Sequence, residues 1–462
     1  MVIPFSALND EKRYEAEFFR KRFLQEDAAL VRLERPQLGS FANVTDGPHG
    51  YHVVDDASPI AMLTAKCASN WFADRVNADC IAKWIDDENS RSRLRNRDVI
   101  LSTRGTVGMC ALVVPEALPA NLDQDVARVS WDDHSEFIPE FVVGYLNSRF
   151  GQDHMARYAS GMVQQGLSLS KVRDIPIPRL GNKLQKAVSQ CVNDALRTRN
   201  HAALNLTKAE NEIIVAIGLR DWHPLEPVTY AAKASEAQSA NRIDAEYFHP
   251  AKKAFLDRLR SLPGKPLGTH YHSVREMFDP KVANAGDFVR NFDLTDALHP
   301  VLDDDQPTMP AREVGSSKKR FAAGDVVISR LRAYLREIAL VRTTPSVLAV
   351  GSSEFIVLRP RDAGKPTLSR SALLVFLRSH PVQTILKWSQ DGSHHPRFGD
   401  EDLMCIPVPD AVCAVAPKVE KLFEEILTAR GQARALLAQA KRGVEIAIET
   451  SEAAALKYLK ES

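Results

Sequence analysis

The spacing of apolar positions predicts two long helices in this chain of 462 residues. Over residues 183–217 apolar side chains recur at alternating steps of three and four, and neither proline nor glycine interrupts them. Over residues 415–447 the same spacing forms an almost continuous heptad seam, and Pro417 is expected in the first turn of that helix. Each seam needs a partner, so we expect the two helices to pair with each other; at ~1.5 Å per residue the first is about 50 Å long.

Shorter apolar runs before each long helix predict a second kind of structure. Residues 9–33 have the pattern of an amphipathic helix. From residue 40 to about 180 the apolar runs are short, and residues 99–101 and 110–114 are typical of strands joined by a turn. Residues 141–158 look helical, with Gly151 as a weak point. This pattern predicts a mixed α/β domain whose sheet is mostly antiparallel or irregular.

The chain repeats itself at a spacing of about half its length. SGMVQQGLSLSKVRDIPIP (residues 160–178) matches DGSHHPRFGDEDLMCIPVP (residues 391–409) at an offset of 391 − 160 = 231. Two further pairs match in the same order: residues 13–19 with 242–248, at 242 − 13 = 229, and residues 98–102 with 325–329, at 325 − 98 = 227. We interpret the chain as a tandem duplication with two related halves.

These patterns predict an α+β fold in which two pseudo-symmetric mixed α/β domains are separated by a two-helix antiparallel coiled coil. The expected parts are a first domain, a central long helix, a second domain and a C-terminal long helix, over residues 1–180, 181–222, 223–412 and 413–462.

Composition places the chain among ordinary globular proteins. Hydrophobic residues make up 44% and charged residues 26%, and the longest apolar runs are too short to cross a bilayer. The N-terminus lacks the features of a signal peptide. Six cysteines without a CxxC pair favour reduced thiols in the cytoplasm, and we expect these cysteines to be core or seam residues.

No catalytic or cofactor motif stands out. The sequence contains no Asn-Pro and no Pro-Pro, which excludes the (Asn/Asp)-Pro-Pro-aromatic loop of an amino-methyltransferase, and neither Gly-Lys pair continues as a P-loop. The pairs His49/His52 and His394/His395 lack the cysteines or carboxylates that would complete a metal site, so a polar binding loop or a plain surface is favoured. We therefore expect neither enzyme activity nor a metal or cofactor on this chain.

Basic residues gather at equivalent places in the two halves, although the formal net charge is only +1. Arg104 follows the strand expected to end at Ser102. The strand expected to end at Ser329 is followed by Arg330, Arg332, Tyr334 and Arg336. Basic side chains hold phosphates, and arginine can read guanine edges with two hydrogen bonds, so we favour DNA contact for these residues.

For other polar residues the sequence leaves a structural and a functional interpretation open. Residues 91–97, with four arginines, form either a solvated loop or part of a DNA-binding surface. The turn that contains Thr106 is either plain structure or a place where the backbone approaches phosphate. Gln164 and Gln165 either read adenine or lie in an ordinary polar loop.

Several of these segments resemble the specificity subunit of type I restriction–modification systems. The segments are TDGPHGYH (residues 45–52), DVILSTRGTVG (98–108), NLDQDVARV (121–129), YLNS (145–148) and the repeated stretch at residues 160–178. The order of domain, long helix, domain, long helix is also similar. The resemblance covers essentially the whole chain; it is strongest over residues 40–220 and weaker over 270–350.

The resemblance implies a non-catalytic subunit that reads DNA. Each domain would be a target-recognition domain that contacts one half of a split double-stranded target, and the paired helices would set the gap between the halves. The helices would also dock two adenine-methyltransferase subunits, which would bind S-adenosylmethionine in place of this chain. A motor–nuclease subunit would be a further partner of such a complex, and no membrane is involved.

The residues expected to contact DNA lie in the loops at the strand ends, in the repeated stretch and in its flanking segments. They are His49, Tyr51, Arg104, Thr106, Gln164, Gln165, Lys318, Lys319, Arg320, Arg330, Arg332, Tyr334, Arg336, His394, His395 and Arg397. Two other functions remain open at this point: a self-contained DNA-acting nuclease with an unrecognised site, and a coiled-coil assembly scaffold.

Overall fold

The chain folds into two compact units. Unit 1 contains residues 1–200 with 429–462, and unit 2 contains residues 201–428. The computed structural model describes residues 15–50, 52–68, 71–76, 78–131, 135–161, 165–362, 364, 366–392 and 395–461. The domain boundaries expected from the sequence stay a prediction.

The centre of unit 1 is a five-stranded sheet in the order β1-β8-β5-β6-β3. All neighbouring pairs are antiparallel except β3 with β6, so the expectation of a mostly antiparallel sheet is confirmed. The strands are β1 (Asn43–Asp46), β8 (Val126–Ser130), β5 (Val99–Ser102), β6 (Cys110–Leu112) and β3 (Trp71–Phe72). A smaller sheet contains β4 (Asp79–Cys80), β2 (Ala61–Leu63) and β7 (Ala120–Leu122).

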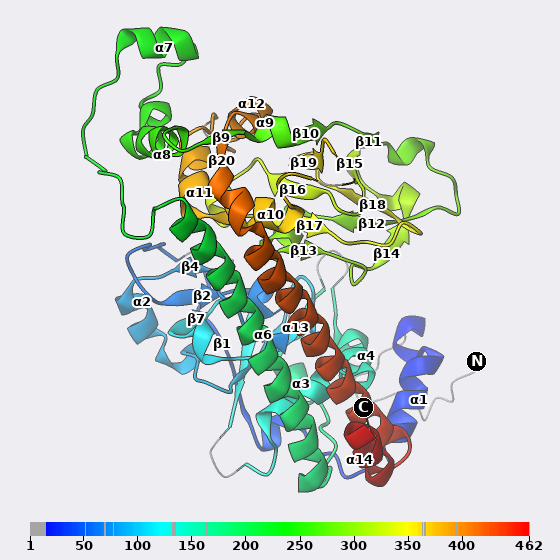
Figure 1. Ribbon diagram of the computed structural model, residues 1–462. Helices are drawn as coiled ribbons and strands as arrows, with labels where there is room; N and C mark the ends of the chain where they lie inside the picture. The colour runs from blue at the N-terminus through cyan, green and yellow to red at the C-terminus, as the bar shows by residue number, and fades with distance from the viewer. Residues whose placement is uncertain are drawn as a thin grey trace. The chain divides into compact units, whose positions relative to one another are not determined.

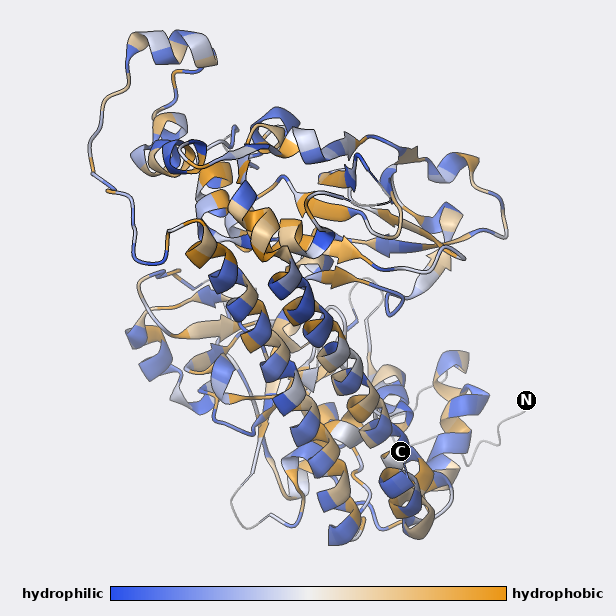
Figure 2. Ribbon diagram, in the orientation of Figure 1, coloured by the Kyte–Doolittle hydropathy of each residue, from blue (hydrophilic) through white to orange (hydrophobic). Residues whose placement is uncertain are grey.

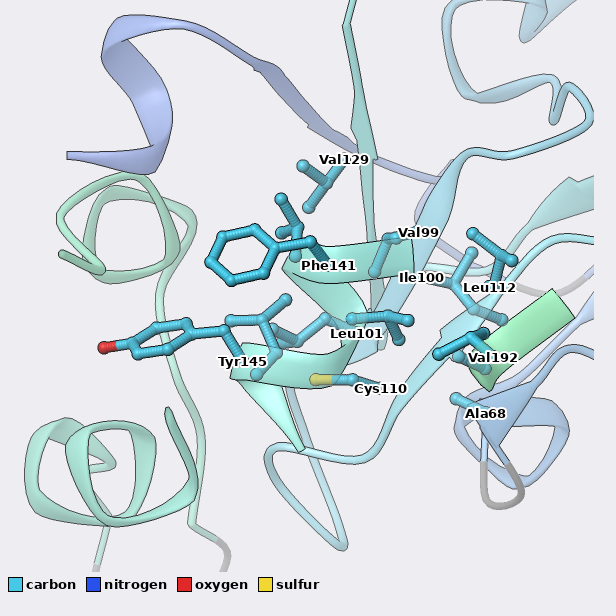
Figure 3. Packing of buried hydrophobic residues seen from close by; sticks show 14 of the residues in the cluster. Ala68, Val99, Ile100, Leu101, Cys110, Leu112, Val129, Phe141, Tyr145 and Val192 are labelled. Carbon is cyan, nitrogen blue, oxygen red and sulfur yellow. The ribbon is translucent and has the colours of Figure 1, made fainter. Parts of the chain in front are cut away.

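All four residues of β5 are buried, because the sheet is covered on both faces. Phe141 and Tyr145 of α3 (Pro139–Leu146) pack near the strand residues Leu101 and Cys110, and Val192 of the first long helix joins the same core (Figure 3). The other helices of this unit before the long helix are α1 (Lys21–Leu30), α2 (Lys83–Glu88), α4 (Arg149–Tyr158) and α5 (Leu169–Arg173).

Two helix predictions in this unit were partly wrong. The helix expected over residues 9–33 covers only residues 21–30, preceded by a 3-10 turn at Ala16–Phe19, and residues 9–14 lie outside the described residues. Residues 141–158 form two helices that break before Ser148, whose hydroxyl accepts a hydrogen bond from the Gly151 amide at the start of α4. Gly151 is not the break: a Cβ there would lie 2.5 Å from the Tyr145 carbonyl oxygen, so the corner between the helices requires a residue without a side chain.

Unit 2 repeats the sheet of unit 1. Its central sheet has the order β10-β19-β16-β17-β13, with only β13 and β17 parallel. The strands are β10 (Tyr271–Val274), β19 (Phe355–Pro360), β16 (Val326–Ser329), β17 (Ile338–Val341) and β13 (Val301–Leu302). The offsets are 271 − 43 = 228 for β1 and β10 and 326 − 99 = 227 for β5 and β16, so the predicted duplication is confirmed in the fold.

Unit 2 also has a second sheet, with five strands where the second sheet of unit 1 has three. Its strands, in spatial order, are β11 (Met277–Phe278), β15 (Lys318–Phe321), β18 (Leu348–Gly351), β12 (Phe288–Phe292) and β14 (Thr308–Pro310). A short pair joins β20 (Pro407–Pro409) to β9 (Gly264–Pro266). The helices are α7 (Ala234–Ala240), α8 (Pro250–Arg260), α9 (Leu267–His270), α10 (Arg370–Arg378), α11 (His380–Lys387) and α12 (Asp400–Met404).

The two long helices form as predicted and pair with each other. They are α6 (Asn182–Ala216) and α13 (Asp410–Glu449), which run side by side in Figure 1. In unit 2 the Asn205 amide donates to the Glu425 carboxylate at 3.0 Å, and the Lys418 ammonium lies 3.4 Å from Glu212. The sums 205 + 425 and 212 + 418 are both 630, so the helices are antiparallel. In unit 1 residues of both helices belong to one hydrophobic core.

The C-terminal helix differs from the prediction in two ways. It begins at Asp410, so Pro417 lies about two turns inside it and not in its first turn. The segment 413–462 is also not one helix, because α14 (Glu452–Glu461) turns back on α13, where the Gln439 side-chain amide donates to the Leu459 carbonyl at 3.0 Å. Figure 2 shows hydrophilic residues along the exposed side of α6 and α13, whereas β16 and β17 are mostly hydrophobic.

Among the described residues, no helix carries an apolar stretch long enough to span a bilayer. All six cysteines are free thiols. Cys67, Cys110 and Cys191 are buried, as predicted, whereas Cys405 is exposed and the prediction was wrong for it.

Candidate nucleic-acid interface

Each unit has a cluster of three or four loops at the end of its central strand, β5 or β16, where the neighbouring strand β8 or β19 begins. Loop cluster 1, in unit 1, contains residues 47–50, 103–109, 123–125, 159–161 and 165–167. Loop cluster 2, in unit 2, contains residues 330–337, 352–354, 390–392 and 395–398. In both clusters the first residue after the central strand, Thr103 or Arg330, is hydrogen-bonded to two neighbouring loops. The strand ends at which the sequence predicts basic groups are therefore places where several loops meet.

The backbone hydrogen bonds that hold the loops together are the same in both clusters. In loop cluster 1 the Thr103 amide donates to the Asp125 carbonyl (2.8 Å), and the Thr103 carbonyl accepts from the Leu167 amide (2.8 Å). In loop cluster 2 the Arg330 amide donates to the Glu354 carbonyl (3.0 Å), and the Arg330 carbonyl accepts from the Phe398 amide (3.2 Å). The duplication therefore preserves a backbone frame and not only an order of strands.

The repeated stretch that marks the duplication in the sequence forms a small closed loop in each cluster. Ser160 and Gly166 exchange two backbone hydrogen bonds, of 2.9 and 2.8 Å, and Asp391 and Arg397 exchange two of 2.8 Å. The residue after the first position is glycine in both copies, with φ of 120° at Gly161 and 102° at Gly392. Only glycine adopts such angles without strain, which explains why both copies have glycine at their second position.

A buried serine shapes the loop that follows each central strand. The Ser102 hydroxyl donates to the Thr106 carbonyl (2.5 Å) and accepts from the Met109 amide (2.9 Å). The Ser329 hydroxyl lies 3.2 Å from the Leu331 carbonyl. After Ser329, Arg332 and Arg336 have left-handed backbone angles, with φ of 44° and 54°. For a residue with a side chain this conformation costs about 1–2 kcal/mol, so the tip of the loop is held in a strained shape.

Loop cluster 1 brings together four of the predicted residues. The Arg104 guanidinium lies 3.2 Å from the Asp125 carboxylate and is half-exposed. The His49 ring is hydrogen-bonded to the Gln124 side chain at 2.8 Å, next to Asp125 in the chain. Thr106 and Gln165 are exposed in the adjoining loops. Burial raises the pKa of the neighbouring Asp123 carboxyl to about 6, so this cluster can gain a proton near neutral pH.

Loop cluster 2 brings together five more. The Arg397 guanidinium donates two hydrogen bonds to the Glu354 carboxylate, at 2.9 and 2.8 Å. Arg330 lies 3.5 Å from the same carboxylate. These arginines, and the Arg397 hydrogen bonds above all, hold the pKa of the Glu354 carboxyl below its usual value, so it stays ionised. The remaining predicted residues of this group, Arg332, Tyr334 and His395, are exposed.

The charge of the two clusters differs. Loop cluster 1 carries Arg104 against two aspartates, whereas loop cluster 2 carries four arginines against three acidic residues. Exposed ion pairs of the kind that Arg104 makes contribute at most about 1 kcal/mol, so a phosphate or base can replace the carboxylate at little cost.

The other predicted residues are paired elsewhere, lie outside the loop clusters or lie outside the described residues. Arg336 belongs to loop cluster 2, but its guanidinium lies 3.5 Å from Glu210 of α6. Lys318, Lys319 and Arg320 lie on β15 of the second sheet, and because side chains alternate along a strand they do not share one face. Tyr51, Gln164 and His394 lie outside the described residues.

Two arginines of the segment 91–97 are engaged inside unit 1. Arg93 lies 2.6 Å from Asp86, and Arg97 donates two hydrogen bonds to the buried Glu140 carboxylate, at 3.0 and 2.9 Å. For these two arginines the structure favours the interpretation as intramolecular ion pairs. Within the described ranges, no three histidine, cysteine or acidic side chains gather as a metal site.

The sequence analysis missed the acidic partners of the loop arginines. Asp125 and Glu354 each precede the strand that pairs with the central one, at an offset of 354 − 125 = 229. A signal for them was present, because the repeat places an acidic residue at the same position in both halves.

Comparison with known proteins supports one family. No protein-family model matches the chain. Over 181 residues the chain is 24% identical to the type I restriction enzyme EcoBI specificity subunit of Escherichia coli, and the alignment covers 36% of this chain and 37% of that protein. The chain thus matches little more than a third of this relative's length. The match confirms the resemblance seen in the sequence.

Solved structures of similar proteins include three from type I systems. One is the S subunit of a type I restriction–modification system from M. genitalium, with 12% identity, 87% of this chain and 94% of that chain covered, and a TM-score of 0.37. Another is the HsdS subunit from Thermoanaerobacter tengcongensis, with 15% identity, coverages of 90% and 96%, and a TM-score of 0.29. The third comes from work on complex assembly and conformational transition of the type I R-M system, with 16% identity, coverages of 92% and 97%, and a TM-score of 0.27.

Proposed function

We propose that this chain is the DNA-specificity subunit of a type I restriction–modification system and that it reads a double-stranded target in two parts. One observation carries the proposal: loop clusters 1 and 2 have the same backbone frame but different side chains. A duplicated frame with different side chains suits two recognition sites that each read their own sequence. The similarity to the EcoBI specificity subunit supports the same assignment.

In this proposal each cluster positions itself on phosphates and then reads base edges. Loop cluster 2 would supply most of the phosphate contacts, since Arg330 and Arg332 are exposed or half-exposed and Tyr334 can stack or pack beside them. In loop cluster 1, Arg104 would exchange the Asp125 carboxylate for DNA. Because phosphate contacts release counterions, binding should weaken steeply as the salt concentration rises.

The chemistry would belong to partner subunits. The chain would act in the cytoplasm without enzyme activity or a cofactor of its own, and two adenine-methyltransferase subunits would bind S-adenosylmethionine. A motor–nuclease subunit would join in systems that also cut DNA. The antiparallel pair of α6 and α13 would set the number of unspecified base pairs between the two parts of the target.

The test is to purify the chain with its host partners and to map methylated adenines in the host genome. We expect a motif with two specified parts and a fixed gap. Removing equal lengths from α6 and α13 should shorten the preferred gap, whereas the double variant of Arg330→Ala and Arg332→Ala should weaken DNA binding without changing complex assembly. A methylated motif with no gap would refute the proposal, and DNA cleavage by the purified chain with a divalent metal would favour a nuclease instead.

A further inference from the structure

Among the described residues, Arg397 donates three side-chain hydrogen bonds within the protein, more than any other arginine side chain of the two loop clusters. Its backbone exchanges two hydrogen bonds of 2.8 Å with Asp391, which closes the loop at this residue. Its side chain donates from Nε and Nη2 to the two oxygens of Glu354, at 2.9 and 2.8 Å. Its Nη1 donates to the His395 carbonyl at 2.8 Å. Both the backbone and the plane of the guanidinium are therefore fixed.

The hydrogen bonds of Arg397 leave its terminal edge available. A guanidinium has five N–H bonds, and Arg397 uses three of them within the protein. One N–H remains on each terminal nitrogen. The side chain as a whole is 36% exposed, which leaves it accessible to a ligand. Two N–H bonds on neighbouring nitrogens match the O6 and N7 acceptors that guanine presents in the major groove.

Glu354 is the residue that fixes this geometry. It precedes β19, so its backbone is set by the sheet, and its carboxylate stays ionised because Arg397 and the nearby Arg330 surround it. A carboxylate that binds one edge of a guanidinium keeps the side chain from rotating before DNA arrives. Less conformational entropy is then lost when the other edge binds a base.

Loop cluster 1 has the same frame without this device. Gly166 is the equivalent of Arg397. Each exchanges two backbone hydrogen bonds with the first residue of its loop, and the amide of the next residue donates to the residue after the central strand. The acidic residue equivalent to Glu354 is Asp125, which holds the half-exposed Arg104 at 3.2 Å. The two copies therefore differ at the position where an arginine would be pre-positioned, although their backbones agree.

We propose that Arg397 reads a guanine in the half of the target bound by unit 2, and that Glu354 is its positioning residue. This inference rests on the proposed function, since it assigns a base to a site taken to bind DNA. It also predicts that the half-site of unit 1 has no guanine contact from the equivalent position. In this proposal the preference for guanine comes from the two N–H bonds on the terminal nitrogens of Arg397, whose direction Glu354 fixes, and not from the net charge of the surface.

The experiment measures binding of the full chain, purified with its partner subunits, to duplex libraries in which each target position is varied. Arg397→Lys keeps the charge but loses the paired N–H edge, so discrimination at one G·C position of one half-site should fall roughly 5- to 140-fold. Total affinity for the library should change little. Arg342→Lys is the matched control, because Arg342 is an exposed arginine of the same unit paired with Glu424 at 3.7 Å, and it should leave every base preference intact.

Glu354→Gln provides a readout that loss of structure would not give. Discrimination at the same G·C position should fall about 2- to 10-fold, because the arginine is no longer held. Binding to unrelated DNA should rise at the same time, because one negative charge near the phosphates is removed. If Arg397→Lys leaves that position unchanged, or weakens all sequences equally, the inference is wrong while the proposed function stands. If the unaltered complex shows no base preference at all, the proposed function itself fails.

Discussion

Tyr145 and Tyr271 are two fully buried tyrosines whose hydroxyl groups have different surroundings. The Tyr271 hydroxyl donates to the Leu368 carbonyl at 2.9 Å. The Tyr145 hydroxyl has no hydrogen-bond partner within the described part of the chain, and in Figure 3 its oxygen lies on the side away from the strand residues. Burial is the main cause that raises the pKa of both phenols, so both stay neutral. Replacing each by phenylalanine should therefore change stability in opposite directions.

The magnitude follows from the cost of a buried, unpaired hydroxyl group. That cost is about 1–3 kcal/mol, and phenylalanine removes it while keeping the ring that packs in the core of unit 1. Tyr145→Phe should thus stabilise unit 1 by about 1–3 kcal/mol. Tyr271→Phe should destabilise unit 2 by about 1 kcal/mol or more, since it loses a hydrogen bond and leaves the Leu368 carbonyl unpaired.

The assay is hydrogen exchange of the full chain, read separately for peptides of each unit. Two compact units need not unfold together, so a single unfolding curve would not assign the effect. Peptides of β5 and α3 should exchange roughly 5- to 150-fold more slowly in Tyr145→Phe, and those of β16 and α10 should not change. In Tyr271→Phe the unit 2 peptides should exchange faster. Faster exchange of unit 1 in Tyr145→Phe would refute the reasoning, because it would mean that the hydroxyl makes a stabilising contact.

Four further outcomes are expected from unit 1. Gly151→Ala should destabilise unit 1 by about 1–3 kcal/mol in urea unfolding, since the new Cβ would meet backbone atoms. Gly431→Ala should stabilise it by about 1 kcal/mol, because Gly431 lies inside α13 and a Cβ there would have no atom within 4 Å. Burial raises the pKa of the Glu26 carboxyl from 4.5 to about 7. Between these two pH values the folded state keeps a proton that the unfolded state has released. The free energy of unfolding of unit 1, relative to that of Glu26→Gln, should therefore fall as the pH rises from 4.5 to about 7. A relative stability that rises with pH would contradict this sign. Asp98→Asn should lower the free energy of unfolding by about 3–5 kcal/mol, because it leaves the buried Arg128 guanidinium, which lies 2.7 Å from Asp98, without its counter-charge. A loss below about 1 kcal/mol in the same unfolding experiment would show that the ion pair is not needed for stability.

The long helices and the duplication could be predicted from the sequence, because their signals are local or repeated. The heptad seam of α13 and the uninterrupted spacing of α6 depend only on the period of apolar residues, and the bounds of α6 differ by one residue at each end from the predicted seam. Where a helix breaks was harder to predict. The corner at Ser148 depends on a close approach between Gly151 and the Tyr145 carbonyl, which is a contact between turns and leaves little trace in the local pattern.

The candidate interface divides in the same way. The sequence placed Arg104 and Arg330 after equivalent strands, because an arginine that follows a strand is visible in the chain order. It also grouped Arg336 with them, although that guanidinium turns to Glu210, which lies 126 residues earlier (336 − 210). It included Arg397 but not Glu354, since an ion pair between distant residues has no local signature.

By itself, the sequence determined that this protein has two related halves, two long paired helices and basic residues at the ends of equivalent strands. These features follow from two signals that are visible along the chain. The spacing of apolar residues is local, and the duplication repeats a whole segment of sequence. The tertiary structure decided which of those basic residues are free to meet a ligand, which are neutralised and which arginine is held rigid. That choice depends on carboxylates brought close by the folded backbone, and their distance in space is not encoded in their distance along the chain.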